Sequence, residues 1–134
     1  MAILDIKKAF EKTLNSITPS IQTAYEAVSF TPTQGVPYQK VQLSPNQPDN
    51  PTIGDGYYRE VGEFQVFLCY PSNKGTSEVL TRAELVRSYF QRGTTLVEGA
   101  SEIIIIRTPQ IAGTSIIGDR IIVPVLIQYS VGVF

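Results

Sequence analysis

The carboxyl-terminal third of the chain holds more apolar, strand-forming sequence than one exposed sheet can bury. Four consecutive isoleucines occupy residues 103–106, and a second apolar stretch covers residues 121–127. Continuous apolar runs are typical of strands covered on both faces. Pro124 has no backbone N–H, which predicts an edge or a bulge at that point. The chain must cover this surface with a second sheet, as in a sandwich, or with a neighbouring subunit.

Two amphipathic helices are predicted, one near the amino terminus and one past the middle of the chain. Residues 4–17 repeat apolar side chains at helical spacing, and Pro19 ends this helix. Its apolar positions are Ile3, Ile6, Phe10, Leu14 and Ile17. The second helix is expected to begin at Thr76 or Ser77 and to stop at Gly93. Its apolar positions are Val79, Ala83, Val86 and Phe90.

Several segments carry the alternating pattern of strands. The pattern is clearest at residues 63–70 and weaker at residues 21–28, around Val41 and Leu43, and at residues 94–98. Gly118 and Asp119 join residues 115–117 to residues 120–123 in a hairpin pattern. The order of helix, strands, helix and strands predicts an α+β fold. We expect a single domain, residues 1–134, whose largely antiparallel or mixed sheet carries two helices on one face and a β-hairpin.

Residues 44–56 form a long segment rich in proline and glycine. It contains Asp49 and Asp55 but no lysine or arginine, and Ile53 is its only large apolar residue. Such a composition predicts an exposed loop that is mobile in the isolated protein. A loop of this length in so small a domain indicates a function.

The composition removes most catalytic and DNA-binding mechanisms. The chain has no histidine, the commonest general base near neutral pH. Eleven basic and twelve acidic residues give a net charge of -1, which attracts neither nucleic acid nor an anionic membrane. Cys69 is the single cysteine and is expected as a small buried side chain. No apolar stretch approaches 18 residues, so we expect no membrane span.

The carboxylates do not form a convincing catalytic or metal site. Two carboxylate pairs close in sequence are Glu60 with Glu63 and Asp5 with Glu11. On a strand, residues 60 and 63 point to opposite faces, so they cannot act on one bond. Residues 49–55 lack the ligand spacing of a calcium loop. We predict no catalytic residue, no metal site and no cofactor, with a small enzyme that uses Glu, Asp or Tyr in a pocket as a distant alternative.

Short motifs follow one another in a characteristic order along nearly the whole chain. After the first helix come Phe30-Thr31-Pro32, Val36-Pro37-Tyr38-Gln39, the proline-rich loop, residues 58–66, Tyr70-Pro71, a helix ending in Phe90-Gln91-Arg92-Gly93, and residues 123–129. In this order they resemble the tail terminator family of long-tailed bacteriophages.

The resemblance implies a structural virion protein without catalysis. It implies a hexameric ring that sits on the last ring of the tail tube, stops polymerisation and presents the surface for head joining. The implied partners are further copies of the chain, the tail tube protein and a head-completion or connector protein. DNA would pass through the ring without specific binding, and no membrane is involved. The implied location is the head-proximal end of the tail in the virion, after assembly in the host cytoplasm.

Two alternatives to the terminator remain besides the enzyme. One is another head-to-tail connector or tail-completion protein, and the other is a monomeric binding module with covered sheet edges. For the terminator, contacts with other subunits or with the tube are expected beside the long loop and at the end of the chain. Aromatic and arginine side chains are favoured at interfaces, although the two tyrosines could equally pack on their own sheet. The candidates are Tyr57, Tyr58, Arg59, Val131, Val133 and Phe134.

The excess of apolar strand surface predicts a homo-oligomer. Analytical ultracentrifugation at high protein concentration should detect species heavier than the 14.8 kDa monomer. A monodisperse monomer that also fails to assemble on meeting a partner protein would contradict this expectation.

Overall fold

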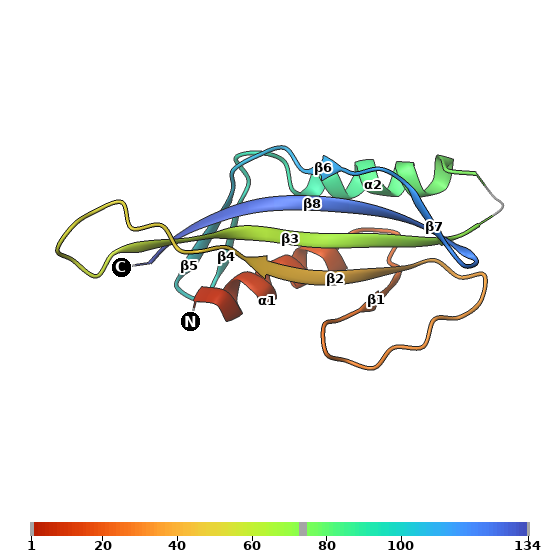
Figure 1. Cartoon of the computed structure of the whole chain (residues 1–134), viewed down its shortest axis with the longest axis horizontal. Helices are drawn as coiled ribbons and strands as arrows, with labels where there is room; N and C mark the ends of the chain where they lie inside the picture. The colour runs from red at the N-terminus through yellow and green to blue at the C-terminus, as the bar shows by residue number, and fades with distance from the viewer. Residues whose placement is uncertain (1, 73–74, 134) are drawn as a thin grey trace.

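The computed structural model describes residues 2–72 and 75–133, which form two helices and one curved sheet (Figure 1). The helices are α1 (Ala2–Asn15) and α2 (Ser77–Tyr89). The strands are β1 (Gln22–Ala24), β2 (Tyr38–Pro45), β3 (Tyr58–Pro71), β4 (Thr95–Glu98), β5 (Ser101–Ile105), β6 (Gln110–Ile111), β7 (Ser115–Ile117) and β8 (Arg120–Val133). The predicted α+β class and the β7–β8 hairpin are confirmed.

The sheet is built around the pairing of its two longest strands. Its order is β1-β2-β3-β8-β5-β4, and the short strands β6 and β7 also pair with β8. β1 and β2 are parallel, and the other pairs between described strands are antiparallel. β3 and β8 pair without interruption from Tyr58 opposite Val133 to Pro71 opposite Arg120. The described strands form one sheet, so the sandwich alternative is wrong.

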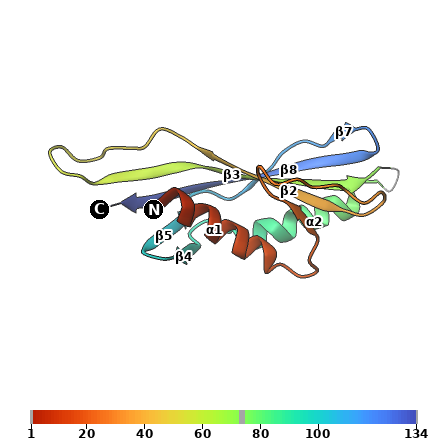
Figure 2. The ribbon, with the colours of Figure 1, turned by 90° about the horizontal axis from the view of Figure 1, so that it is seen from below.

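Both helices pack on the same face of this sheet, as Figure 2 shows. The inward stripe of α1 is buried at Ile6, Phe10 and Leu14, as predicted. Ile3 was expected on this stripe but is 39% exposed, because the packed part of the helix starts one turn later. In the second helical segment all four predicted positions are buried, namely Val79, Ala83, Val86 and Phe90.

An aromatic cluster forms the centre of the core. The Phe10 ring stacks on Phe64, with centroids 4.6 Å apart and planes 11° from parallel. It also lies 5.5 Å from the Phe90 ring and 5.7 Å from the Tyr129 ring. Offset and tilted ring pairs add stability beyond the area they bury. The cluster therefore joins α1, the end of the second helical segment, β3 and β8.

Two element boundaries differ from the sequence prediction. The strand expected at residues 21–28 stops at Ala24, and a turn follows in which the N–H of Val28 donates to Tyr25. Beyond Ala24, the Glu26 carboxylate accepts the Leu43 N–H at 2.6 Å, so a side chain satisfies the edge of β2 where a strand was expected. α2 begins where predicted, with Thr76 at the N-cap, although the Thr76 side chain makes no capping hydrogen bond. The helix ends at Tyr89, before the stop expected at Gly93.

The apolar runs are covered on one face only. Ile103 and Ile105 are fully buried, whereas Ile104 is 44% exposed and Ile106 is 40% exposed. β8 shows the same alternation, with buried Val123, Val125 and Ile127. The single chain therefore covers residues 103–106 on one face only, which agrees with the expectation that one copy does not bury all of this apolar strand surface. The side chains on the face that the helices do not cover stay accessible to solvent.

β8 lies inside the sheet, so it is no edge strand, but no described strand pairs with Pro124 on the side that its nitrogen faces, which agrees with the predicted local break in pairing. The N–H of Ala112 donates to the Pro124 carbonyl at 2.9 Å, which places the carbonyl on the β6 side of β8. In a strand, the nitrogen and the carbonyl of one residue point to the same side. On that side β6 ends at Ile111 and β7 begins at Ser115, so neither short strand continues past Pro124. The missing donor therefore leaves the β3–β8 ladder intact.

Gly62 lies at a crowded point between β2 and β8. A Cβ atom there would be 2.6 Å from the Tyr129 hydroxyl, 2.7 Å from the Ser44 carbonyl oxygen and 2.9 Å from the Pro45 Cα. Two of these atoms belong to the backbone and cannot turn away. We expect Gly62→Ala to lower the free energy of unfolding by about 2 kcal/mol in urea titrations.

Gly56→Ala is the matched control, because no atom lies within 4 Å of its added carbon. Its free energy of unfolding should stay within about 0.5 kcal/mol of the parent value. Equal losses in the two variants would show that crowding at Gly62 is not the cause.

Candidate assembly surfaces

The described residues hold no cluster of three or more His, Cys, Asp or Glu side chains able to bind a metal ion. Within the same residues, no helix is long and apolar enough to cross a membrane. Glu60 is 9% exposed on the core side of β3, and Glu63 lies on the opposite face, so the pair is separated as expected. Cys69 is buried as predicted, and burial raises the pKa of its thiol. The candidate sites are therefore surfaces.

The loop between β2 and β3 projects beyond the sheet at one end of the molecule (Figure 1). Residues 46–56 are exposed throughout. The hairpin nevertheless continues into the loop, since Asp49 and Arg59 exchange two backbone hydrogen bonds of 2.8 Å and their side chains approach to 3.6 Å. Nearer the tip, Asp55 accepts hydrogen bonds from the Thr52 hydroxyl at 2.6 Å and the Tyr57 N–H at 3.1 Å. The predicted exposure is confirmed, and mobility in the isolated protein stays a prediction.

The structure brings the predicted contact residues to the base of this loop. Tyr58 is paired with Val133, and Arg59 is paired with Gly132. Tyr57 lies over Gly132, whose added Cβ would meet the tyrosine hydroxyl at 3.1 Å. These side chains are half-buried, except that Val131 is 1% exposed within the core and offers no side-chain surface. Phe134 lies outside the described residues.

The β7–β8 hairpin, at the end of the molecule opposite the β2–β3 loop, carries exposed apolar side chains. In β7, Ile116 is 74% exposed and Ile117 is 62% exposed. The hairpin pattern predicted the strand but not the exposure of its isoleucines. Ile53 at the tip of the β2–β3 loop is fully exposed, and Val97 on the edge strand β4 is 68% exposed. Single exposed apolar side chains are normal on a protein surface, so among these residues the adjoining pair Ile116 and Ile117 is the clearest candidate for a contact.

The sheet face opposite the helices is only partly covered. At one end, Arg120 lies 5.1 Å from the centroid of the Tyr38 ring and donates to the carbonyls of Thr33 and Val36, so the loop before β2 is held there. The rest of this face carries half-buried or exposed side chains. They are Lys40, Gln42 and Ser44 of β2, Arg59, Val61, Glu63, Gln65 and Phe67 of β3, Glu102 and Ile104 of β5, and Pro124, Leu126, Gln128 and Ser130 of β8. This outer face is mixed in polarity and nearly neutral.

Arginines gather where the second helical segment meets the β5–β6 connection. Three adjoining hollows share Thr108, and Arg87, Arg92 and Arg107 line them. Arg87 is fixed, because its Nε donates to the Pro109 carbonyl at 3.0 Å. We call these three side chains the arginine cluster. Sequence reasoning missed it because the three positions are scattered over two segments.

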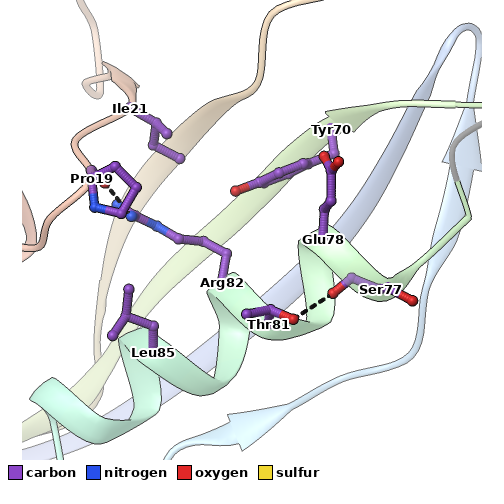
Figure 3. A pocket seen from close by; sticks show the side chains of 8 residues that line it. All are labelled: Pro19, Ile21, Tyr70, Ser77, Glu78, Thr81, Arg82 and Leu85. Atoms are coloured by element: carbon purple, nitrogen blue, oxygen red, sulfur yellow. Dashed lines mark hydrogen bonds between the residues drawn. The ribbon is translucent and has the colours of Figure 1, made fainter.

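A separate groove lies between α2, the end of β3 and the segment after α1 (Figure 3). Its cavity of about 380 Å³ is mainly apolar. Arg82 extends across it toward Pro19 and donates to that carbonyl, while its Nε and second terminal nitrogen have no partner among the described residues. Burial lowers the pKa of Arg82 and raises the pKa of Tyr70. Glu78, one helical turn before Arg82, lines the same groove.

The family described as phage tail terminator protein matches residues 5–129. The chain belongs to this family. Its membership makes the protein a structural component of a phage tail and favours a role without catalysis. The resemblance stated from the sequence motifs is thereby confirmed.

Solved structures share the fold of this tail terminator family member over its full length. One solved chain has a TM-score of 0.80 at 21% identity, and the match covers 100% of this chain and 98% of that chain. A chain from the virion of a native gene transfer agent particle has a TM-score of 0.68 at 14% identity, covering 98% of both chains. No curated protein matches the sequence significantly.

The exposed tip of β7 should matter for assembly and not for folding. We expect the double variant Ile116→Ser/Ile117→Ser to keep its free energy of unfolding within about 0.5 kcal/mol, because both side chains are mostly in solvent. Its amount in purified tails should fall by about tenfold, as for loss of an interface anchor. Quantitative mass spectrometry of tails measures this.

The control is Val28→Ser, which removes an apolar side chain that is 60% exposed in another loop. It should change neither quantity. Normal incorporation of the β7 variant would show that this tip makes no contact in the tail.

Proposed function

We propose that this protein forms a closed hexameric ring that sits on the last ring of the tail tube, stops its polymerisation and presents the surface for head joining. Membership of the tail terminator family supports this proposal. The structural observation that carries it is the one-sided covering of the sheet, which leaves a mixed outer face and apolar tips for contacts with other chains.

Ring closure needs two different, complementary surfaces on each copy. A head-to-tail contact joins one surface of a subunit to another surface of its neighbour, and six such contacts close when the rotation is right. The described sheet has two unlike edges, β1 and β4, and its exposed apolar tips lie at opposite ends. This distribution supports a ring better than a two-fold dimer, in which one surface meets its own copy.

The ring would hold other proteins firmly and DNA only loosely. Its partners are the tail tube protein on one side and a head-completion or connector protein on the other. The charged side chains of the outer face among the described strands are Lys40, Arg59 and Arg120 against Glu63 and Glu102, so the face is nearly neutral, and the whole chain has a net charge of -1. Neither gives the phosphate contacts that hold DNA, which supports passage of DNA without specific binding. The ring would assemble in the host cytoplasm and remain at the head-proximal end of the tail.

Electron microscopy of tails assembled without this protein tests the capping role. We expect tubes longer than normal and without heads, because nothing would stop the addition of tube rings. Adding back the purified protein before the tubes grow should restore normal length. Tubes of normal length that lack heads would contradict capping and would favour a connector or tail-completion protein instead.

A further inference from the structure

The arginine cluster presents cations that the chain itself does not neutralise. Arg92 and Arg107 are exposed, and neither forms a hydrogen bond or ion pair with another described residue. Glu84 lines one of the hollows, which leaves an excess of positive charge. Unpaired arginines grouped around hollows are suited to bind carboxylates, because each guanidinium offers several donors in one plane.

The backbone around the cluster is held in place. The Gly93 N–H donates to the Ile105 carbonyl at 2.8 Å, and the Ile105 N–H donates to Thr94 at 2.9 Å. These bonds fix the turn that carries Arg92 against the end of β5. The next residue, Ile106, lines the same hollow as Arg92 and Arg107 and is 40% exposed. The surface therefore consists of an apolar side chain flanked by two arginines.

The β2–β3 loop has the complementary pattern. Ile53 is fully exposed, and the carboxylates of Asp49 and Asp55 lie on either side of it in sequence. The Asp49 carboxylate is 3.6 Å from the Arg59 guanidinium and stays more than half exposed, so it can still meet a second arginine. The loop contains no lysine or arginine from residue 46 to residue 58. Its hairpin bonds and the Asp55 turn hold it in a projecting shape. An apolar side chain flanked by two acids thus faces solvent at one end of the molecule.

We propose that the acidic loop of one copy docks on the arginine cluster of the next copy, with Ile53 against Ile106 and the two aspartates against Arg92 and Arg107. The inference rests on the ring proposed above and names its contact. No described hydrogen bond or ion pair joins the loop to the cluster within one chain. Each copy offers a loop and a cluster, so the contact is head-to-tail and can close a ring.

A charge exchange tests the contact. Native mass spectrometry and sedimentation would measure the ring population of Arg92→Glu/Arg107→Glu, of Asp49→Lys/Asp55→Lys, and of all four changes together, with and without tail tubes. Each pair alone should reduce the ring population by about tenfold or more, because like charges then meet. The combination should return it to within about threefold of the parent.

The control Lys8→Glu/Lys12→Glu reverses two exposed charges on α1, outside the contact, and should leave the ring population unchanged. Urea titrations of each variant would separate loss of docking from loss of folding. If the fourfold variant assembles no better than either pair, the arginines and aspartates do not meet.

Disulfide cross-linking gives a second readout that does not depend on charge. In a Cys69→Ala background, Ile53→Cys/Ile106→Cys should form a ladder of covalent oligomers up to the hexamer under oxidising conditions. Either cysteine alone should give at most a dimer. The pair Ile53→Cys/Val97→Cys places the second cysteine at a more exposed site outside the contact and should give no ladder.

The outcomes separate this inference from the ring itself. A parent protein that forms rings, together with no ladder and no effect of charge reversal, would overturn the docking contact and leave the ring standing. A cross-link confined to the monomer would also overturn it, because loop and cluster would then meet within one chain. A parent protein that forms no ring, alone or on tubes, would overturn both proposals.

Discussion

The packing of Phe10 against three other rings joins both helical segments to the two long strands, and the rest of the molecule depends on it. Phe64 and Tyr129 lie on β3 and β8, and Phe90 ends the second helical segment. Because all of these side chains are on one face, the helices can cover only that face of the sheet. The core is complete within one chain, whereas the outer face and the tips are left for contacts with other molecules.

Some buried polar groups find no hydrogen-bond partner in the part of the chain that the structure describes. The Tyr129 hydroxyl has no hydrogen-bond partner among the described residues, and burial, followed by the nearby Glu60, raises its pKa to about 12. The ring therefore stays neutral throughout the ordinary pH range. The same hydroxyl lies close to Gly62, so the sheet there has space for glycine and for no larger residue. Packing rather than polar bonding sets the structure at this point.

The sequence predicted the parts of the fold that follow from local patterns. Spacing in the helices located most of their buried side chains, and alternation at residues 63–70 located the centre of β3. The full length of β3 and β8 was not predictable, because the ends of each strand are extended only through pairing with the other strand. The sequence left open whether Pro124 marks an edge or a bulge, since only the tertiary structure shows which side of β8 its nitrogen faces. The loop was recognised by its composition, but the arginine cluster needs the turn after Phe90 and the β5–β6 connection to be placed together.

The uninterrupted pairing of β3 and β8 has a mechanical consequence. The β2–β3 loop enters this ribbon at one end, and the β7 hairpin enters it at the other. Tension applied between those ends would pull the strands past each other in shear, which loads their backbone bonds in parallel instead of opening them one by one. Each strand has fourteen residues at about 3.3 Å each, so the paired strands resist stretching over about 45 Å along the length of the protein.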